Sequence, residues 1–210
     1  ISLDSLRKER FCQITRKDDF ERVWNGIEEA LRVGLSPIKI NMVAIQGLND
    51  DEIESFAQLT FHLPLTVRYI EYMPSGNGEE WKKSDILTIP QIKGRLENVG
   101  KLIPIPSDRW DGPAKRFRIE GAMGEIGLIG PVSSHFCDDC NRLRLTPDGK
   151  IRTCLFSDEE IDVKGLLRKG GSDRDLKERL LVALKAKPER HPINTHQFKK
   201  CQRNMSAIGG

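Results

Sequence analysis

The sequence predicts an α/β protein in which strands and helices alternate through the first hundred residues. Residues 38–45 and 65–73 are rich in β-branched side chains, and a helix capped by Asn49 with Glu52 is expected between them. Such alternation favours βαβ units and a parallel sheet. About two and a half units are present, too few to close a barrel. This number of units agrees with a missing N-terminal part.

The opening helices follow from capping and periodicity. A short helix is expected over residues 5–15, and a second begins at Asp18, which stands at capping-box spacing from Glu21. The second helix carries an apolar face at helical spacing. This face is made by Phe20, Val23, Trp24, Ile27 and Leu31.

Polar residues interrupt both strands on a face that a parallel sheet normally buries. Lys39 and Asn41 alternate with apolar neighbours and therefore point to the same side of the first strand. Arg68 interrupts the second strand in the same way. A salt bridge would explain one buried charge. Two cations on neighbouring strands favour a face turned toward an anion, as in a barrel interior.

The sequence pattern changes beyond residue 100. Two strands are expected around residues 121–124, and residues 141–155 read as a hairpin that turns at Asp148-Gly149. A basic helical region follows, with twelve Lys and Arg against four Asp and Glu between residues 164 and 203. Residues 101–210 are therefore expected to form a second, small domain built from an antiparallel hairpin and helices.

Three of the five cysteines have the spacing C-x2-C-x13-C, at Cys137, Cys140 and Cys154. The predicted hairpin explains this spacing, because its tight turn brings Cys154 back beside the loop that carries the other two. Structural zinc normally takes four Cys or His ligands, and His135 or Cys201 could be the fourth. Unbound buried thiols are a second interpretation. An iron–sulfur cluster held by three cysteines, with one iron left open, is the third, and spacing alone does not choose between the metals.

Two arginines follow the second cysteine of this set. Arg142 and Arg144 stand at i, i+2, which on a strand places both guanidinium groups on one face. Guanidinium forks bind phosphate or purine acceptor atoms through paired hydrogen bonds. The simpler interpretation is a pair of surface arginines, and the sequence leaves both open.

Composition limits the class of protein. Charged residues make up 31% and hydrophobic residues 38%, and no apolar run approaches the roughly 18 to 20 residues of a membrane helix. No apolar core of a signal peptide is present. An odd number of cysteines, three of them bunched, favours a metal or cluster site in a reducing compartment over disulfides. Aromatic residues are only 6%, without the stacking pattern of a nucleic-acid binder.

Several stretches together resemble one known family, the radical-SAM GTP 3′,8-cyclases of molybdenum cofactor biosynthesis. They are "ISLDSL", "PIKINMV", "VRYIEYMP", "GPVSSHFCDDCNRLRLTPDGKIRTCLF" and "MSAIGG", in order along the whole chain. The resemblance implies that residues 1–100 form the C-terminal portion of an incomplete, TIM-like radical-SAM (β/α) barrel. It implies that residues 101–210 form a domain that binds GTP and carries a second [4Fe–4S] cluster. It also implies that a first [4Fe–4S] cluster, held by a CxxxCxxC motif, cleaves S-adenosylmethionine to a radical that initiates cyclisation of GTP.

The resemblance assigns roles residue by residue. The second-cluster ligands are Cys137, Cys140 and Cys154, and the open iron is expected to contact the guanine. The GTP contacts are Lys39, Arg68, Arg142, Leu143 and Arg144. Ser2 and Met73 match S-adenosylmethionine contacts, the assignment of Met73 resting on its place at a strand end. The catalytic groups are Arg142, Arg144 and the terminal Gly209 and Gly210, whose tail is expected to reach into the active site.

One departure from the family is large: the chain contains no CxxxCxxC motif. We therefore expect it to represent the C-terminal two-thirds of the enzyme, unable by itself to cleave S-adenosylmethionine. Cys12 and Cys201 receive no ligand role. The other hypotheses are a radical-SAM enzyme with an auxiliary cluster that acts on a peptide, and a zinc-stabilised binding module.

The resemblance also implies partners and a compartment. GTP is the substrate, and a cyclic pyranopterin monophosphate synthase acts next in the pathway. A homodimer is compatible with it, and neither nucleic acid nor a membrane is an expected partner. The expected location is the bacterial cytoplasm, or the mitochondrion in a eukaryote.

Overall fold

The structure is a computed structural model. It describes residues 1–73, 83–106, 112–191, 201–203 and 207–208. The described residues divide into two compact units. The first unit holds residues 1–72 and 83–135, and the second holds Met73 and the described residues from 136 onward.

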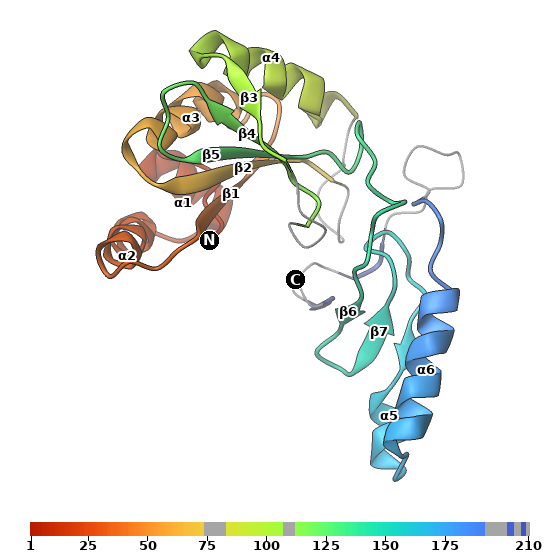
Figure 1. Ribbon diagram of the computed structural model, residues 1–210. Helices are drawn as coiled ribbons and strands as arrows, with labels where there is room; N and C mark the ends of the chain where they lie inside the picture. Colours follow the sequence, from red (N-terminus) through yellow and green to blue (C-terminus); the bar gives the residue numbers. More distant parts are fainter. Residues whose placement is uncertain (74–82, 107–111, 192–200, 204–206, 209–210) are drawn as a thin grey trace. The chain divides into compact units, whose positions relative to one another are not determined.

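The first unit is built on a five-stranded sheet (Figure 1). In spatial order its strands are β1 (Ile38–Ala44), β2 (Leu65–Glu71), β5 (Glu125–Ile129), β4 (Lys115–Ile119) and β3 (Leu102–Pro104). β1, β2 and β5 run parallel, whereas β4 is antiparallel to both of its neighbours. The α/β class with a parallel sheet is thus confirmed.

Four helices pack with this sheet around one apolar core. They are α1 (Lys8–Thr15), α2 (Phe20–Arg32), α3 (Ile53–His62) and α4 (Ile89–Val99), with single 3-10 turns at Asp50–Glu52 and Lys83–Asp85. Figure 1 shows α3 and α4 along the same side of the sheet. The apolar face predicted for residues 20–31 is confirmed, because its five residues all lie in or against this core.

Alternation along β1 and β2 fixes which face of the sheet meets the helices. Every second residue of β1, from Ile38 to Ala44, is buried, and the residues between are half-buried. In β2 the buried set includes Val67 and Tyr69, whereas Arg68 between them is half-buried. The sheet therefore has one apolar face covered by helices and a second face that carries polar side chains.

The predicted helix caps are wrong in detail. The N-cap of α2 is Asp19, not Asp18, and its side chain makes no capping hydrogen bond, so the expected capping box is not formed. Asn49 is buried and donates to the carbonyl oxygens of Asp4 at 2.8 Å and Val43 at 2.9 Å. The Asn49 side chain therefore binds backbone groups outside the helix, and the predicted cap with Glu52 is not formed.

The second unit is smaller. β6 (Arg144–Leu145), β7 (Lys150–Arg152) and β8 (Ile161–Asp162) form an antiparallel sheet in that order. α5 (Lys164–Arg168) and α6 (Asp173–Lys185) follow, and a core of Ile151, Val163 and Ala183 joins sheet and helix. The predicted hairpin is confirmed, and β8 adds a strand that the sequence did not indicate.

Strands β4 and β5 confirm the pair expected around residues 121–124, but they lie in the first unit. Compactness places the boundary between His135 and Phe136. The division at residue 100, between a barrel portion and a portion that binds the cluster and GTP, remains a proposal. Within the parts of the chain that the structure describes, no helix combines the length and the apolar character of a membrane span.

A buried carboxylate joins three segments at the carboxyl end of β2. Glu71 is fully buried, and its Oε1 accepts a hydrogen bond from the N–H of Ile89 at 2.8 Å, at the start of α4. Its Oε2 accepts from the N–H groups of Val132 at 2.7 Å and Ser133 at 2.9 Å, and the Ser133 hydroxyl donates to Oε1. These bonds fix the backbone that leads, in sequence, to Cys137.

Replacing Glu71 with Ala would leave several buried N–H groups without an acceptor. We expect the free energy of unfolding to fall by about 3 kcal/mol, since each unsatisfied buried donor costs on the order of 1–3 kcal/mol. Chemical denaturation measures this change. Glu97→Ala is the control, because Glu97 is exposed on α4 and pairs only with Lys93 at 3.5 Å among its described contacts. Equal effects in both variants would contradict a structural role for Glu71.

Candidate functional site

The turn between β6 and β7 is closed by local hydrogen bonds. The N–H of Thr146 donates to the carbonyl of Lys150 at 2.8 Å, and the N–H of Gly149 donates to the carbonyl of Thr146 at 2.9 Å. Gly149 has φ +81°, a conformation that side chains with a Cβ rarely adopt. The turn reverses the chain so that residues before β6 and after β7 lie at the same end of the hairpin.

Three thiols gather at that end. Cys137, Cys140 and Cys154 are half-buried free thiols, and the N–H of Cys140 donates to the carbonyl of Cys137 at 3.1 Å. Burial raises the pKa of Cys154, and the charges of the other two thiols raise it further. Lys187 Nζ lies 3.5 Å from Cys140 Sγ and 3.0 Å from the carbonyl oxygen of Thr153, the residue before Cys154, so these two thiol-bearing segments are close together. Among the described residues, no three His, Cys, Asp or Glu side chains are grouped so as to hold a single metal ion.

Cys140 differs from Cys154 in its electrostatic environment. Burial raises the pKa of the Cys140 thiol, but a hydrogen bond from the backbone of Arg142 and the charge of Lys187 outweigh it, so the pKa is lowered overall. Lys187 Nζ lies 3.5 Å from Cys140 Sγ. The thiolate, which is the form that binds metals, is thus favoured at this position.

The two arginines are both half-buried beside these thiols. Arg142 lies over the ring of Phe136 at 5.0 Å, and Arg144 begins β6 opposite Arg152. Because β6 begins at Arg144, the regular strand from which we predicted a shared face does not include Arg142. Burial lowers the pKa of Arg144, and the charges of Arg142 and Arg152 lower it further. Cations crowded in this way favour a bound anion.

The C-terminal segment is anchored to the hairpin by an ion-pair network. Arg203 donates to both carboxylate oxygens of Asp148 at 2.9 Å, and its Nε lies 2.8 Å from Glu160 Oε1. Cys201 Sγ lies 3.1 Å from the carbonyl oxygen of Leu155. The Arg152 side chain is fully buried, with Nη1 3.5 Å from the same Glu160 oxygen.

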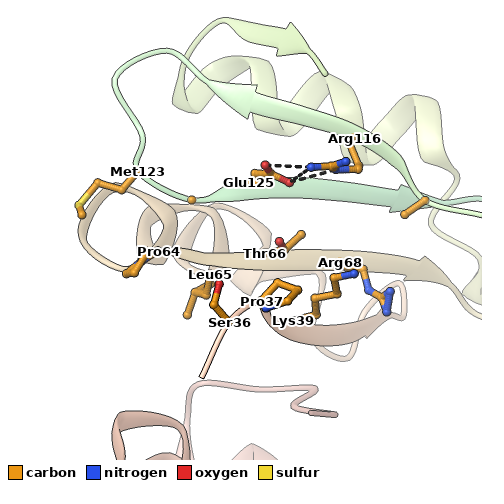
Figure 2. A pocket seen from close by; sticks show the side chains of 12 residues that line it. Ser36, Pro37, Lys39, Pro64, Leu65, Thr66, Arg68, Arg116, Met123 and Glu125 are labelled. Carbon is orange, nitrogen blue, oxygen red and sulfur yellow. Dashed lines mark hydrogen bonds and ion pairs between the residues drawn. The ribbon is translucent and has the colours of Figure 1, made fainter. Parts of the chain in front are cut away.

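In the first unit, the polar face of the sheet forms a pocket of about 260 Å³ (Figure 2). Lys39 of β1 and Arg68 of β2 both line it, as the sequence predicted for neighbouring strands. Arg116 and Glu125, joined by an ion pair of 2.9 Å, form another part of the wall. Both cations of the predicted anion-facing surface are therefore brought to one hollow.

Two neighbours set the position of Arg68. Its Nε donates to Oδ1 of Asn41 at 2.9 Å, so the amide on β1 directs the guanidinium. A Cβ at Gly127 would lie 3.0 Å from Arg68 Cγ, so glycine leaves room for the arginine stem. Ser2 forms a parallel bridge with Asn41, which places it on the outer side of β1.

Two family models match this chain. The model described as Molybdenum Cofactor Synthesis C matches residues 65–193, which is more than half of the chain. The chain belongs to the Molybdenum Cofactor Synthesis C family. The model described as Radical SAM superfamily matches residues 1–60, in the first unit.

Curated relatives of this Molybdenum Cofactor Synthesis C chain carry one name, "GTP 3′,8-cyclase". The protein of Alkaliphilus oremlandii is 45% identical over 210 residues, and that of Syntrophomonas wolfei is 44% identical over 210 residues. The protein of Moorella thermoacetica is 45% identical over 212 residues. Each match covers 100% of this chain, and the chain spans 64% of the length of these relatives.

The structure separates the sequence-predicted residues of this family member into groups. Lys39 and Arg68 share the sheet of the first unit, and Ser2 is bridged to its edge strand β1. The cysteines and their arginines lie in the second unit. Met73 is half-buried and falls in the second unit. Leu143 packs against the core of that unit, and its contact with GTP remains a prediction. Gly209 and Gly210 lie outside the described residues.

Sequence reasoning missed Lys187. It stands in a run of basic residues without periodicity, and nothing in the sequence distinguishes it from exposed neighbours. Its position becomes informative only through the backbone carbonyls and the thiol that it contacts.

We expect attachment of the C-terminal segment to depend on pH in the acid range. The hydrogen bond from Arg203 holds the pKa of Asp148 well below its usual range, aided by Thr146. A depressed carboxyl pKa stabilises the folded form fully above the unfolded value of about 3.9, and this stabilisation is lost as pH falls further. NMR titration of the Asp148 carboxyl carbon measures the shift.

Arg203→Gln should return the midpoint of that titration toward the ordinary Asp value. Arg174→Gln is the matched control, because Arg174 is exposed and pairs with Glu178 at 3.2 Å, outside this network. An Asp148 midpoint that is unchanged in Arg203→Gln would contradict the anchoring role.

Proposed function

We propose that this chain forms part of a radical-SAM GTP 3′,8-cyclase and carries its GTP site and second cluster. The reaction converts GTP, with S-adenosylmethionine, to (8S)-3′,8-cyclo-7,8-dihydroguanosine 5′-triphosphate in molybdenum cofactor biosynthesis. The observation that carries the proposal is the grouping of three half-buried thiols with Arg142, Arg144 and Lys187 in one unit. The relatives named GTP 3′,8-cyclase support the same assignment.

In this proposal Cys137, Cys140 and Cys154 hold a [4Fe–4S] cluster. The donor set fits this group, because all three are free, half-buried thiols and Lys187 links the segment of Cys140 to that of Cys154. When bound, a cluster with three cysteine ligands offers one iron as an open position for a ligand. The cationic surroundings suit both thiolates and an anionic nucleotide.

In this proposal, cationic side chains of both units bind GTP. Lys39 and Arg68 supply positive charge in the pocket of the first unit, and Asn41 directs the guanidinium of Arg68. Arg142 and Arg144 supply guanidinium forks in the second unit, where their mutual repulsion is relieved by a bound phosphate or purine acceptor. Gly209 and Gly210 are proposed to complete the site as a tail without side chains.

S-adenosylmethionine is proposed to contact Ser2 and Met73. The polar face of β1, β2 and β5 is proposed to face the interior of an incomplete barrel, which extends over residues 1–100 in the functional division. A first [4Fe–4S] cluster requires a CxxxCxxC motif that these 210 residues lack. The resemblance further assigns this activity to the bacterial cytoplasm, or a mitochondrion, upstream of cyclic pyranopterin monophosphate synthase.

Replacing Arg144 with Ala should weaken GTP binding roughly 10- to 150-fold, equivalent to about 1.5–3 kcal/mol for a charge-assisted hydrogen bond. Anaerobic titration calorimetry of the iron-loaded chain measures the change. Arg144→Lys keeps the charge but not the fork, and is expected to recover part of the loss. The control is Arg174→Ala, since that side chain is 87% exposed on α6. Wild-type affinity in Arg144→Ala would remove this residue from the site.

Replacing Cys154 with Ser should abolish incorporation of the cluster. After anaerobic reconstitution with iron and sulfide, the wild-type chain should hold about four irons, with EPR or Mössbauer spectra that change on addition of GTP. Cys201→Ser should match the wild type, because Cys201 contacts the Leu155 carbonyl and receives no ligand role. One bound zinc without iron, and no response to GTP, would instead support the zinc-stabilised module.

A further inference from the structure

Lys187 makes a set of contacts that neither the resemblance nor the comparisons assign. It follows the last turn of α6, and its half-buried side chain places Nζ near three acceptors. These are Cys140 Sγ at 3.5 Å, the carbonyl oxygen of Arg142 at 2.8 Å and that of Thr153 at 3.0 Å. An ammonium group has three N–H donors, so this set uses all of them.

The three acceptors come from the two segments that carry thiols. Arg142 lies two residues after Cys140, and Thr153 immediately precedes Cys154. The paired ladder of β6 and β7 ends at Arg144 and Arg152, so both carbonyl groups lie beyond its last pair. Lys187 thus links the two chain segments at the end of the hairpin where the ladder stops.

The helix that precedes Lys187 is well fixed within the second unit. Ala183 is fully buried against the hairpin core, with Leu180 and Leu176 packed beside it. Ser172 and Asp175 close the first turn through a reciprocal capping box. The lysine therefore extends from a supported element, and packing of α6 on the sheet determines where its ammonium lies.

The charge of Lys187 is directed at the thiols. Its three described acceptors are two neutral carbonyls and a sulfur, and none of its described partners is a carboxylate. A cation that donates to a ligand sulfur stabilises the thiolate and any more negative state of a cluster bound there.

We propose that Lys187 is a positioning residue for the second cluster: it fixes the segment of Cys140 relative to that of Cys154 and supplies positive charge to the ligand sulfurs. This inference rests on the proposed cluster. It predicts that Lys187 strengthens retention of the cluster and raises its reduction potential.

The test compares Lys187→Met with Lys185→Met in the full 210-residue chain. Methionine keeps most of the length of the apolar stem but removes the charge and the donors. Lys185 is the exposed last residue of α6, so its variant controls for loss of a basic side chain on the same helix. Lys187→Arg keeps the positive charge and the N–H donors. It provides a second variant if Lys187→Met fails to fold. Circular dichroism and thermal unfolding establish the fold of each metal-free variant.

After anaerobic reconstitution, iron loss to a chelator and the reduction potential of the cluster are measured. Loss of a residue that supports metal ligands typically costs 10- to 100-fold in affinity, so we expect Lys187→Met to release iron about that much more readily. Its potential should shift to more negative values, and Lys187→Arg should recover part of both effects. Lys185→Met should behave as the wild type.

Two results would overturn the inference, and they differ. If the wild type holds the cluster and folded Lys187→Met matches it in chelator resistance and potential, the positioning role is wrong while the proposed function stands. If the wild type incorporates no iron, the proposed cluster fails and the role of Lys187 fails with it.

Discussion

A parallel sheet that buries only one of its faces is the constraint on which the first unit depends. Helices cover the side of Ile40 and Val67, whereas the opposite side carries Lys39 and Arg68. A guanidinium in the middle of a strand is stable only with hydrogen-bond partners or solvent. Asn41 on the neighbouring strand supplies one such partner. The same alternation that builds the core thus determines that the remaining face is polar and suited to anions.

The sequence predicted the elements of this sheet where the pattern was local. Period-two alternation located β1, and helical spacing from Phe20 to Leu31 located the buried face of α2. Prediction failed where distant segments compete for a side chain. Asparagine is a residue type preferred at helix N-caps. The side-chain amide of Asn49 instead donates to the carbonyl oxygens of Asp4 and Val43, which come close to it only in the folded chain. Capping preferences describe an isolated helix and do not account for partners that come from distant parts of the chain.

The candidate site shows the same division. A tight Asp-Gly turn was sufficient to predict that the segments of Cys140 and Cys154 lie at the same end of the hairpin. Lys187 was not predictable, because two of its three acceptors are backbone carbonyls, which every residue possesses and which leave no trace in sequence. β8 escaped notice for a related reason: two residues are too few to show a period.

Asp148 occupies the turn of the cysteine hairpin and also holds Arg203, 55 residues later in the chain. This double use joins contacts of very different range. A hairpin closes within microseconds from local contacts, whereas closing the longer loop has a larger entropic cost. The hydrogen bonds of the turn do not involve Arg203, whereas the pair with Arg203 requires the turn that presents the Asp148 carboxylate.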